Sequence, residues 1–229
     1  MMLAILSHPA FPSFPTRSCR DLHDQCTAWA ASGECARNVG FMKLHACRRS
    51  CGSCAEDASD LLPQLQLVDE SFMTTPRHGG GSCARVVPSS LRWGADAVMA
   101  RSIGCFNRRG AEPSGSWQHT ALAAAATAAA TAGRSLTFYD STSRRPLFVV
   151  PRNRTMADFL AESQQHGWPS FREEELVVHN LRVLRGTGGE VVSVDGVHLG
   201  HNLPDARSRF CINLVSIAGE PPDDGEESS

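Results

Sequence analysis

The chain has 229 residues, of which 41% are hydrophobic and 20% are charged, and its formal net charge is −2. This length allows one or two domains with a proper hydrophobic core, and the balanced charge gives no basic surface for nucleic acid or an anionic membrane. No apolar run approaches the roughly 20 residues of a membrane-spanning helix, so we expect no membrane span. The balanced charge leads us to expect no nucleic-acid partner.

The two ends of the chain differ in composition from the rest. Residues 1–18 begin with a short apolar run and then break at Pro9, Pro12 and Pro15. A secretory signal peptide needs a basic start and an apolar run of about 7–15 residues, so this leader is either the remnant of a signal or an unstructured segment. Residues 220–229 are acidic, and we expect them to be disordered.

Six of the nine cysteines fall between Cys19 and Cys54. A segment this small cannot bury enough apolar surface to fold alone, so the cluster indicates a disulfide framework. The CxxC at residues 51–54 raises zinc binding as an alternative, but the remaining spacings supply no second matched pair. Spacing alone does not choose among the pairings that six cysteines allow.

The neighbours of these cysteines carry a resemblance. They are Cys19-Arg20-Asp21, Cys26-Thr27-Ala28-Trp29-Ala30, Gly33-Glu34-Cys35, Asn38, Phe41-Met42, Cys47 and Ser50-Cys51-Gly52-Ser53-Cys54. Together they resemble the ShKT domain, a module named for a sea-anemone potassium-channel toxin and often attached to secreted enzymes. The resemblance implies two short helices and the disulfides Cys19–Cys54, Cys26–Cys47 and Cys35–Cys51. Because Phe41-Met42 stands where the toxins have a Lys-Tyr dyad, an accessory binding or spacer role is favoured over channel block.

Residues 55–98 are expected to link this module to a second domain. Residues 61–67 fit a short helix or strand, whereas residues 74–82 contain Pro76 and three consecutive glycines. Glycine and proline in such numbers hold regular structure only at a cost in free energy. The linker prediction therefore rests mainly on the 74–82 segment, with Cys83 just beyond it.

The second domain, residues 99–219, is predicted to be a small antiparallel β domain with few helices. Asp195-Gly196 predicts a tight hairpin over residues 191–197, and only residues 155–164 have a helical pattern. Residues 121–132 are almost all Ala and Thr and have no apolar stripe. We expect them to be part of a low-complexity surface insertion, residues 119–133, although alanine is the best helix former. Strand-like runs cover residues 136–139, 147–150, 175–178, 181–184, 190–194 and 210–217.

A thiol in the last strand-like run stands among groups that activate thiols. Arg209 supplies a fixed positive charge, Asn213 a neutral donor, and the segment His198-Leu199-Gly200-His201 two titratable imidazoles. Cations and hydrogen-bond donors favour the thiolate, which is the nucleophilic form of cysteine. On this segment alone, however, a buried and inert cysteine is the favoured interpretation of Cys211, because such cysteines are common.

Several motifs in a fixed order carry a second resemblance. They are Gly110-Ala111-Glu112-Pro113, residues 159–163, Gly167-Trp168-Pro169-Ser170-Phe171, Val197-His198-Leu199-Gly200-His201, Pro204-Asp205 and Arg209-Phe210-Cys211-Ile212-Asn213. Together they resemble the peptide-methionine (R)-S-oxide reductases over residues 110–219. The resemblance implies the antiparallel β-tent of Mss4-like proteins and an oxidoreductase that repairs methionine-R-sulfoxide in oxidised proteins or peptides. A catalytically weak or inactive binding protein for oxidised methionine, with the ShKT module as its interaction module, is the alternative.

The resemblance also implies residue roles. Cys211 attacks the sulfoxide sulfur and becomes a sulfenic acid, while the indole of Trp168 packs against the substrate methyl group. The two histidines, His198 and His201, help to deliver the proton to the sulfoxide oxygen and position water. Arg209 holds the thiolate and Asn213 orients the site. The seven residues with catalytic roles are Cys211, His198, His201, Trp168, Arg209, Asn213 and Asp205.

Many members of that family hold a structural zinc ion on two CxxC pairs. The corresponding residues 139–142 and 193–195 contain no cysteine, so we expect no zinc and no other bound cofactor. Recycling of the sulfenic acid needs a second thiol, for which we favour Cys105 over Cys83. A structural Cys83–Cys105 bridge, which leaves Cys211 to an external thiol, is the alternative. The reductant in either case is thioredoxin-like.

The cysteine framework also bears on location. Three disulfides need an oxidising compartment, and Asn153-Arg154-Thr155 is an N-glycosylation sequon. We therefore expect the protein to be in the secretory pathway or outside the cell. We also expect it to be a monomer.

Overall fold

The computed structural model describes residues 21, 23–37, 42, 47–53, 65–75, 83–203 and 208–222. Two short helices, α1 (Cys26–Ala31) and α2 (Glu34–Arg37), form the N-terminal module. Disulfides Cys26–Cys47 and Cys35–Cys51 hold them, which confirms two of the three expected pairs. The third pair, Cys19–Cys54, lies outside the described residues. Met42 is buried against the first of these disulfides, so cross-links make up much of this small core.

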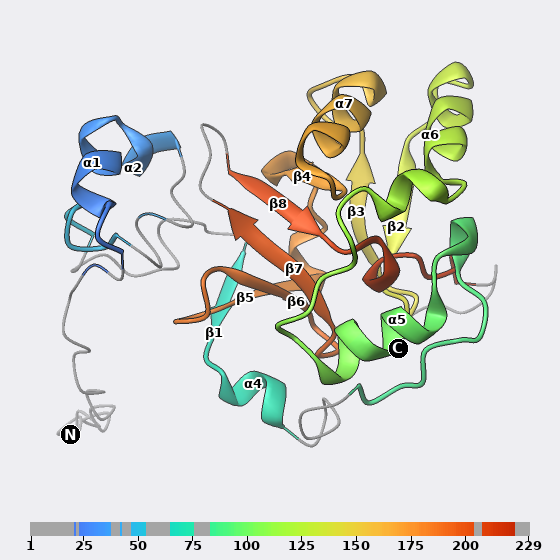
Figure 1. The fold of residues 1–229 in the computed structure, drawn as a ribbon, viewed down its shortest axis with the longest axis horizontal. Coiled ribbons are helices and arrows are strands. Elements are labelled where there is room, and N and C mark those ends of the chain that lie inside the picture. Colours follow the sequence, from blue (N-terminus) through green and yellow to red (C-terminus); the bar gives the residue numbers. More distant parts are fainter. Residues whose placement is uncertain are drawn as a thin grey trace, which may run out of the picture.

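The rest of the described chain is built on two sheets (Figure 1). The smaller sheet is a hairpin of β2 (Leu136–Tyr139) and β3 (Pro146–Val150). The larger sheet has the order β1-β5-β6-β7-β8-β4, in which only the β1–β5 pair is parallel. A sheet-rich domain is therefore confirmed. The strands of the larger sheet are β1 (Gln66–Val68), β4 (Ser170–Arg172), β5 (Leu181–Leu184), β6 (Glu190–Ser193), β7 (His198–Leu203) and β8 (Arg209–Ile212).

Four phenylalanines hold the two sheets together. Phe148 of β3 stacks on Phe171 of β4 with ring centroids 4.2 Å apart, and Phe138 of β2 meets Phe171 edge-on at 5.0 Å. Phe159, from the helix that covers this end, completes the cluster at 5.4 Å from Phe171. All four are fully buried. Large apolar area and favourable ring geometry make this cluster the centre of the core.

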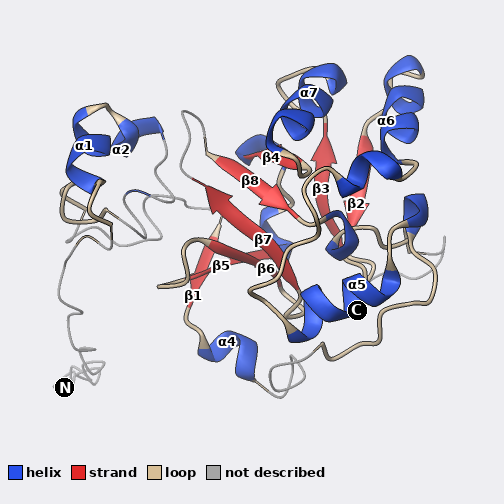
Figure 2. Cartoon of the chain, in the orientation of Figure 1, coloured by secondary structure: helices blue, strands red, loops and turns tan. Residues whose placement is uncertain are grey.

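Helices and turns surround the sheets (Figure 2). The longest, α7 (Met156–His166), begins with a capping box between Thr155 and Asp158 and ends at Gly167 with a φ of 86°. It confirms the helix expected at residues 155–164. The other elements are α4 (Ser71–Thr74), η3 (Arg92–Gly94), α5 (Ala97–Arg101), η4 (Ser102–Phe106), η5 (Ser116–His119), α6 (Leu122–Thr131), η6 (Glu173–Glu175), η7 (Val178–Asn180) and η8 (Leu214–Ser216).

The Ala-rich segment is a core helix, so the predicted surface insertion is wrong. Leu122, Ala126 and Ala129 of α6 are buried, and the helix packs against α7. Methyl groups spaced four and three residues apart form a narrow stripe that lets α6 approach its neighbour closely. The hydroxyl groups of Thr127 and Thr131 donate hydrogen bonds to the carbonyls four residues earlier, at 2.9 and 3.0 Å. Both hydroxyl groups are therefore hydrogen-bonded within the helix.

Three other expectations need correction. Residues 175–178 are not a strand: Glu175 ends η6, Leu176 makes a single bridge with Phe148, and Val178 begins η7. The carboxylate of Glu175 is buried here and pairs with Arg154. The strand expected over 210–217 ends at Ile212. Part of the predicted linker belongs to the larger sheet, since β1 pairs with β5 and Met73 of α4 is buried against Leu184 and Val192. The hairpin predicted at residues 191–197 is confirmed as the β6–β7 connection.

Candidate active site

A free thiol lies at the centre of the candidate site. The register with β7 sets His201 directly opposite Cys211, and β4 sets Ser170 opposite it on the other side. Directly opposed residues in antiparallel strands have Cβ atoms about 4.5–5.5 Å apart on one face. Cys211 is half-buried, and within the described part of the chain it is the one free cysteine. A thiol, an imidazole and a hydroxyl therefore share one face of the sheet.

A bulge brings a second histidine to this face. Strict alternation along β7 would send His198 and His201, three residues apart, to opposite faces. The pairing with β6 shifts between Val191 and Val192, so that His201 pairs with Glu190 and His198 with Val192. The two imidazole centroids consequently lie 5.6 Å apart.

Gly200 makes this bulge sterically feasible. Its φ is 152°, a conformation that side chains rarely allow, and a Cβ added there would lie 2.1 Å from the carbonyl oxygen of Cys211. The same Cβ would lie 2.9 Å from the Cα of Ile212. Glycine at this position therefore lets β7 approach β8 closely enough to set both histidines beside the thiol.

His198 is held by a buried carboxylate. Its ring is 1% exposed, and Nδ1 lies 2.7 Å from Oε1 of Glu190. Arg108 donates to both carboxylate oxygens of Glu190, at 2.8 and 2.7 Å, and also pairs with Glu70 at 2.5 Å. Burial alone would raise the pKa of Glu190, but the hydrogen bonds from His198 and Arg108 outweigh it and lower the pKa to about 2. Because an ionised carboxylate only accepts hydrogen bonds, Nδ1 of His198 carries a proton.

His201 differs from His198 in its electrostatic surroundings. Burial lowers the pKa of His201, the neighbouring His198 lowers it further, and the charge of Glu190 offsets part of this effect. We therefore expect a neutral imidazole at neutral pH. A neutral ring directly opposite a thiol can accept the thiol proton.

Glu112 links the separate segments of the site. Its backbone carbonyl accepts a hydrogen bond from the indole nitrogen of Trp168 at 2.9 Å, and its backbone N–H donates to Oδ1 of Asn213 at 3.1 Å. Its carboxylate is 2% exposed and accepts from the backbone N–H of Leu214 at 2.6 Å and of Val215 at 3.3 Å. Burial raises the pKa of Glu112 to about 7, although these two hydrogen bonds lower it in part.

The surroundings of Cys211 favour its protonated thiol over the thiolate. Burial raises the pKa of Cys211, the positive charge of Arg209 and a hydrogen bond from it lower the pKa, and the charge of Glu112 raises it. Arg209 thus acts in the direction expected from the sequence, but burial outweighs it. Any nucleophilic attack by Cys211 would therefore require loss of this proton to a base.

These opposing effects predict the pH dependence of alkylation at Cys211. We expect the iodoacetamide rate to rise with pH and to reach its midpoint above that of a free cysteine, because the thiolate is the reactive form. Arg209→Met should shift the midpoint upward. Glu112→Gln should shift it downward, since this carboxylate is ionised where the thiol titrates. Mass spectrometry of the Cys211 peptide measures each profile, and shifts in the reverse directions would contradict this account of the charges.

Of the seven residues with predicted roles, six belong to this arrangement, and Asp205 lies outside the described residues. Sequence reasoning missed the roles of Glu112, Glu190 and Arg108. Glu112 was visible only as part of the Gly110-Ala111-Glu112-Pro113 motif. Glu190 stands two residues before Val192, which pairs with His198, but nothing local marks it as a partner of that ring.

The position of the remaining cysteines changes the recycling scheme. Cys83 and Cys105 form a disulfide with Cα atoms 4.7 Å apart. In this bridged state Cys105 has no free thiol, so the resolving role that we favoured for it would require reduction of the bridge. The structural bridge, the alternative drawn from the sequence, is the arrangement present.

The residues that correspond to the zinc pairs do not fit a metal ion. Oδ1 of Asp140 accepts from the backbone N–H of Thr142 at 2.7 Å and of Ser143 at 3.0 Å, and Asp195 pairs with Arg145 at 3.1 Å. The donor set has no thiolate or imidazole, and both carboxylates already have partners. Across the described residues, no cluster of three or more histidine, cysteine, aspartate or glutamate side chains has a metal-site arrangement.

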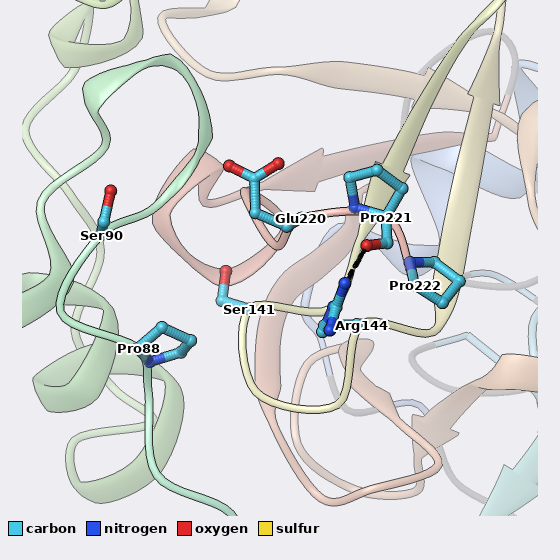
Figure 3. A pocket seen from close by; sticks show the side chains of 7 residues that line it. All are labelled: Pro88, Ser90, Ser141, Arg144, Glu220, Pro221 and Pro222. Carbon is cyan, nitrogen blue, oxygen red and sulfur yellow. Dashed lines mark hydrogen bonds between the residues drawn. The ribbon is translucent and has the colours of Figure 1, made fainter. Parts of the chain in front are cut away.

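A hollow in the described part of the chain lies away from this thiol (Figure 3). It measures about 580 Å³ and is lined by Pro88, Ser90, Ser141, Arg144, Glu220, Pro221 and Pro222. Nε of Arg144 donates to the Pro221 carbonyl at 3.2 Å, so the C-terminal segment closes one side. This lining contains no thiol or imidazole, and we therefore assign the candidate site to Cys211 on chemistry rather than on volume.

Comparisons with known proteins bear on the N-terminal module. Residues 18–54 match the family model described as ShK domain-like. This match agrees with the resemblance drawn from the six cysteines. The chain is also similar to two proteins of Caenorhabditis elegans. It is 36% identical to zinc metalloproteinase nas-15 over 69 residues, which are 30% of this chain and 12% of that protein.

The second relative is peroxidase mlt-7, with 42% identity over 48 residues, or 21% of this chain and 6% of that protein. The chain thus covers only a small part of either relative. No solved structure matches it. None of the helices in the described residues combines the length and apolar character needed to cross a membrane.

Proposed function

We propose that the sheet domain reduces methionine-R-sulfoxide in oxidised peptides, and that its two sheets are a β-tent like that of the peptide-methionine (R)-S-oxide reductases. The observation that carries the proposal is the half-exposed Cys211, with the neutral ring of His201 opposite it and the anchored indole of Trp168 nearby. A nucleophile, a base and a flat apolar surface are what reduction of a methyl sulfoxide requires.

The proposed reaction transfers one oxygen atom. Cys211 gives up its thiol proton to His201, and its sulfur attacks the sulfoxide sulfur while the sulfoxide oxygen is protonated. The oxygen then passes to Cys211, so that methionine leaves and a sulfenic acid remains. The thiol supplies two electrons, the sulfoxide sulfur gains them, and the proton taken by His201 is returned.

His198 and the groups around it have a positioning role in this scheme. Glu190 accepts from Nδ1 of His198 and so fixes the tautomer, while Arg108 keeps Glu190 ionised. Asn213 and Trp168 are both bound to the backbone of Glu112, which sets the indole relative to the end of β8. Pre-positioned groups reduce the ordering that substrate binding must otherwise bring about.

Recycling follows from the bridge between Cys83 and Cys105. With both thiols occupied, an external thiol attacks the sulfenic acid of Cys211, water leaves, and a second thiol displaces the mixed disulfide. A thioredoxin-like dithiol supplies both thiols. The half-exposed position of Cys211 admits such a partner.

The double variant Cys83→Ser/Cys105→Ser tests this recycling scheme. The bridge closes a sequence separation of 22 residues, so its loss should lower the free energy of unfolding by about 3 kcal/mol. Turnover with dithiothreitol and with thioredoxin should both persist below the lowered melting temperature. Urea unfolding and steady-state rates measure the two effects, and selective loss of thioredoxin-driven turnover would return the resolving role to this pair.

The decisive experiment is turnover of a chromophore-tagged methionine-R-sulfoxide with dithiothreitol as the reductant. The S epimer is the matched control, and we expect only the R epimer to be reduced. Binding of the R epimer without turnover would instead support the inactive binding protein.

We further propose that the ShK domain-like module is an accessory binding or spacer unit and that the protein passes through the secretory pathway. Its dense disulfides support this location. Titration of free thiols in protein from its native source tests it, because free thiols throughout residues 19–54 would exclude an oxidising compartment.

A further inference from the structure

The loop between β3 and α7 carries a feature that the proposed reduction does not use. Asn153 lies in this loop with a φ of 55°, and its side chain is exposed. Within the described part of the chain, no hydrogen bond holds its side-chain amide. The segment Asn153-Arg154-Thr155 is the one Asn-X-Ser/Thr sequence of the whole chain. An exposed and unengaged amide can be modified without disturbing the fold.

Arg154 fixes the direction in which Asn153 points. Its side chain is only 9% exposed and runs inward to Glu175, at 2.5 Å, and to the carbonyl of Ser170, at 2.8 Å. Glu162 binds it as well, at 2.5 Å. With Arg154 anchored in the interior, the neighbouring Asn153 remains on the surface.

Thr155, the third residue of the sequence, has a second task. Its hydroxyl accepts from the backbone N–H of Asp158 at 3.1 Å and donates to the Asp158 carboxylate at 2.7 Å. This capping box starts α7. In the folded protein the hydroxyl is therefore occupied, and an enzyme that recognises it must compete with the helix cap.

We propose that Asn153 carries an N-linked oligosaccharide and that the sugar is attached before α7 forms. In the transfer, Nδ2 of Asn153 forms a bond to the anomeric carbon of a lipid-diphosphate-linked oligosaccharide. The bond from that carbon to the diphosphate breaks, the lipid diphosphate leaves, and the amide releases one proton. The proposal goes beyond the reductase function and does not depend on it.

The attachment point of the sugar lies at the end of α7 opposite to Trp168, whose indole the proposed reaction uses. Asn153 precedes the first turn of α7, whereas Trp168 follows its last residue. A helix of 11 residues is about 16 Å long at 1.5 Å per residue. The length of the helix therefore separates the modified amide from the indole.

The test uses the full chain secreted from a eukaryotic host behind a secretion leader. Wild type should show one mobility shift that peptide-N-glycosidase removes, with conversion of Asn153 to aspartate in the corresponding peptide. Asn153→Gln should lack the shift. Thr155→Ser, which keeps both the sequon and the cap, should retain it.

Thr155→Asn separates modification from folding. Asparagine is as good an N-cap as serine or threonine, and its amide can accept from the backbone of Asp158 and donate to its carboxylate as the Thr155 hydroxyl does. The change destroys the sequon, so this variant should fold with a nearly unchanged melting temperature and carry no sugar. An unmodified Asn153 in the secreted, folded wild type would overturn the proposal, as would a shift that persists in Asn153→Gln or Thr155→Asn. Incubation of unglycosylated folded protein with host microsomes should add no sugar, and efficient addition there would overturn the order of events.

Discussion

Cys211→Ser is expected to remove at least about 10³-fold of the turnover of methionine-R-sulfoxide, because loss of an enzyme's nucleophile leaves only binding and residual polarisation. Serine keeps the size of the side chain. Its hydroxyl is a far weaker nucleophile than a thiol, and it cannot pass through a sulfenic acid. The chromophore assay with dithiothreitol measures the loss.

Two controls make this result specific to the thiol. The melting temperature of Cys211→Ser should match that of wild type, since the exchange is small and the site is half-buried. The double variant Cys83→Ser/Cys105→Ser also loses sulfur atoms but should keep its turnover. Activity that persists in Cys211→Ser would mean that the proposed reaction is wrong.

Glu175→Ala should lower the free energy of unfolding by about 3–5 kcal/mol. Glu175 is 0% exposed and binds Arg154 through both oxygens, at 2.7 and 2.5 Å. It also accepts the backbone N–H of Arg172 at 2.9 Å. Its removal leaves the guanidinium of Arg154 buried with less compensating charge, and that uncompensated charge is the main cost.

The site should respond to the same substitution. Arg154 also donates to the carbonyl of Ser170, the residue that β4 sets opposite Cys211. We expect turnover in Glu175→Ala to fall at temperatures where the protein is still folded. Urea unfolding gives the stability, and Arg154→Met/Glu175→Leu, which removes both charges, should recover much of it. A loss below about 1 kcal/mol, the range of surface pairs, would show that this pair is not desolvated.

Local signals predicted much of the N-terminal module and of α7. The cysteine neighbours identified the module through resemblance, and two of its implied disulfides are present. The apolar positions of α7 lie on one face, and Thr155 begins a capping box that is readable in the chain. The helix depends on residues a few positions apart, and the module was identified by short segments around its cysteines, so both are readable in the linear sequence.

Features that depend on distant partners were not predictable. β1 has three residues and is defined by parallel pairing with β5, more than a hundred positions later. The burial of α6 depends on α7, because alanine methyl groups form a stripe only against a close neighbour. Glu190 gains its role through Arg108, 82 positions away. In each case the deciding contact was absent from the local sequence.

The conformation of Gly200 predicts how position 200 responds to substitution. It carries no functional group and contacts no substrate in the proposed reaction. Any side chain would still collide with the backbone of β8 and displace the histidines from the thiol. In a saturation mutagenesis screen for activity, position 200 should therefore be as intolerant as position 211. A screen scored for folding alone should separate them, with serine accepted at position 211 and only glycine at position 200.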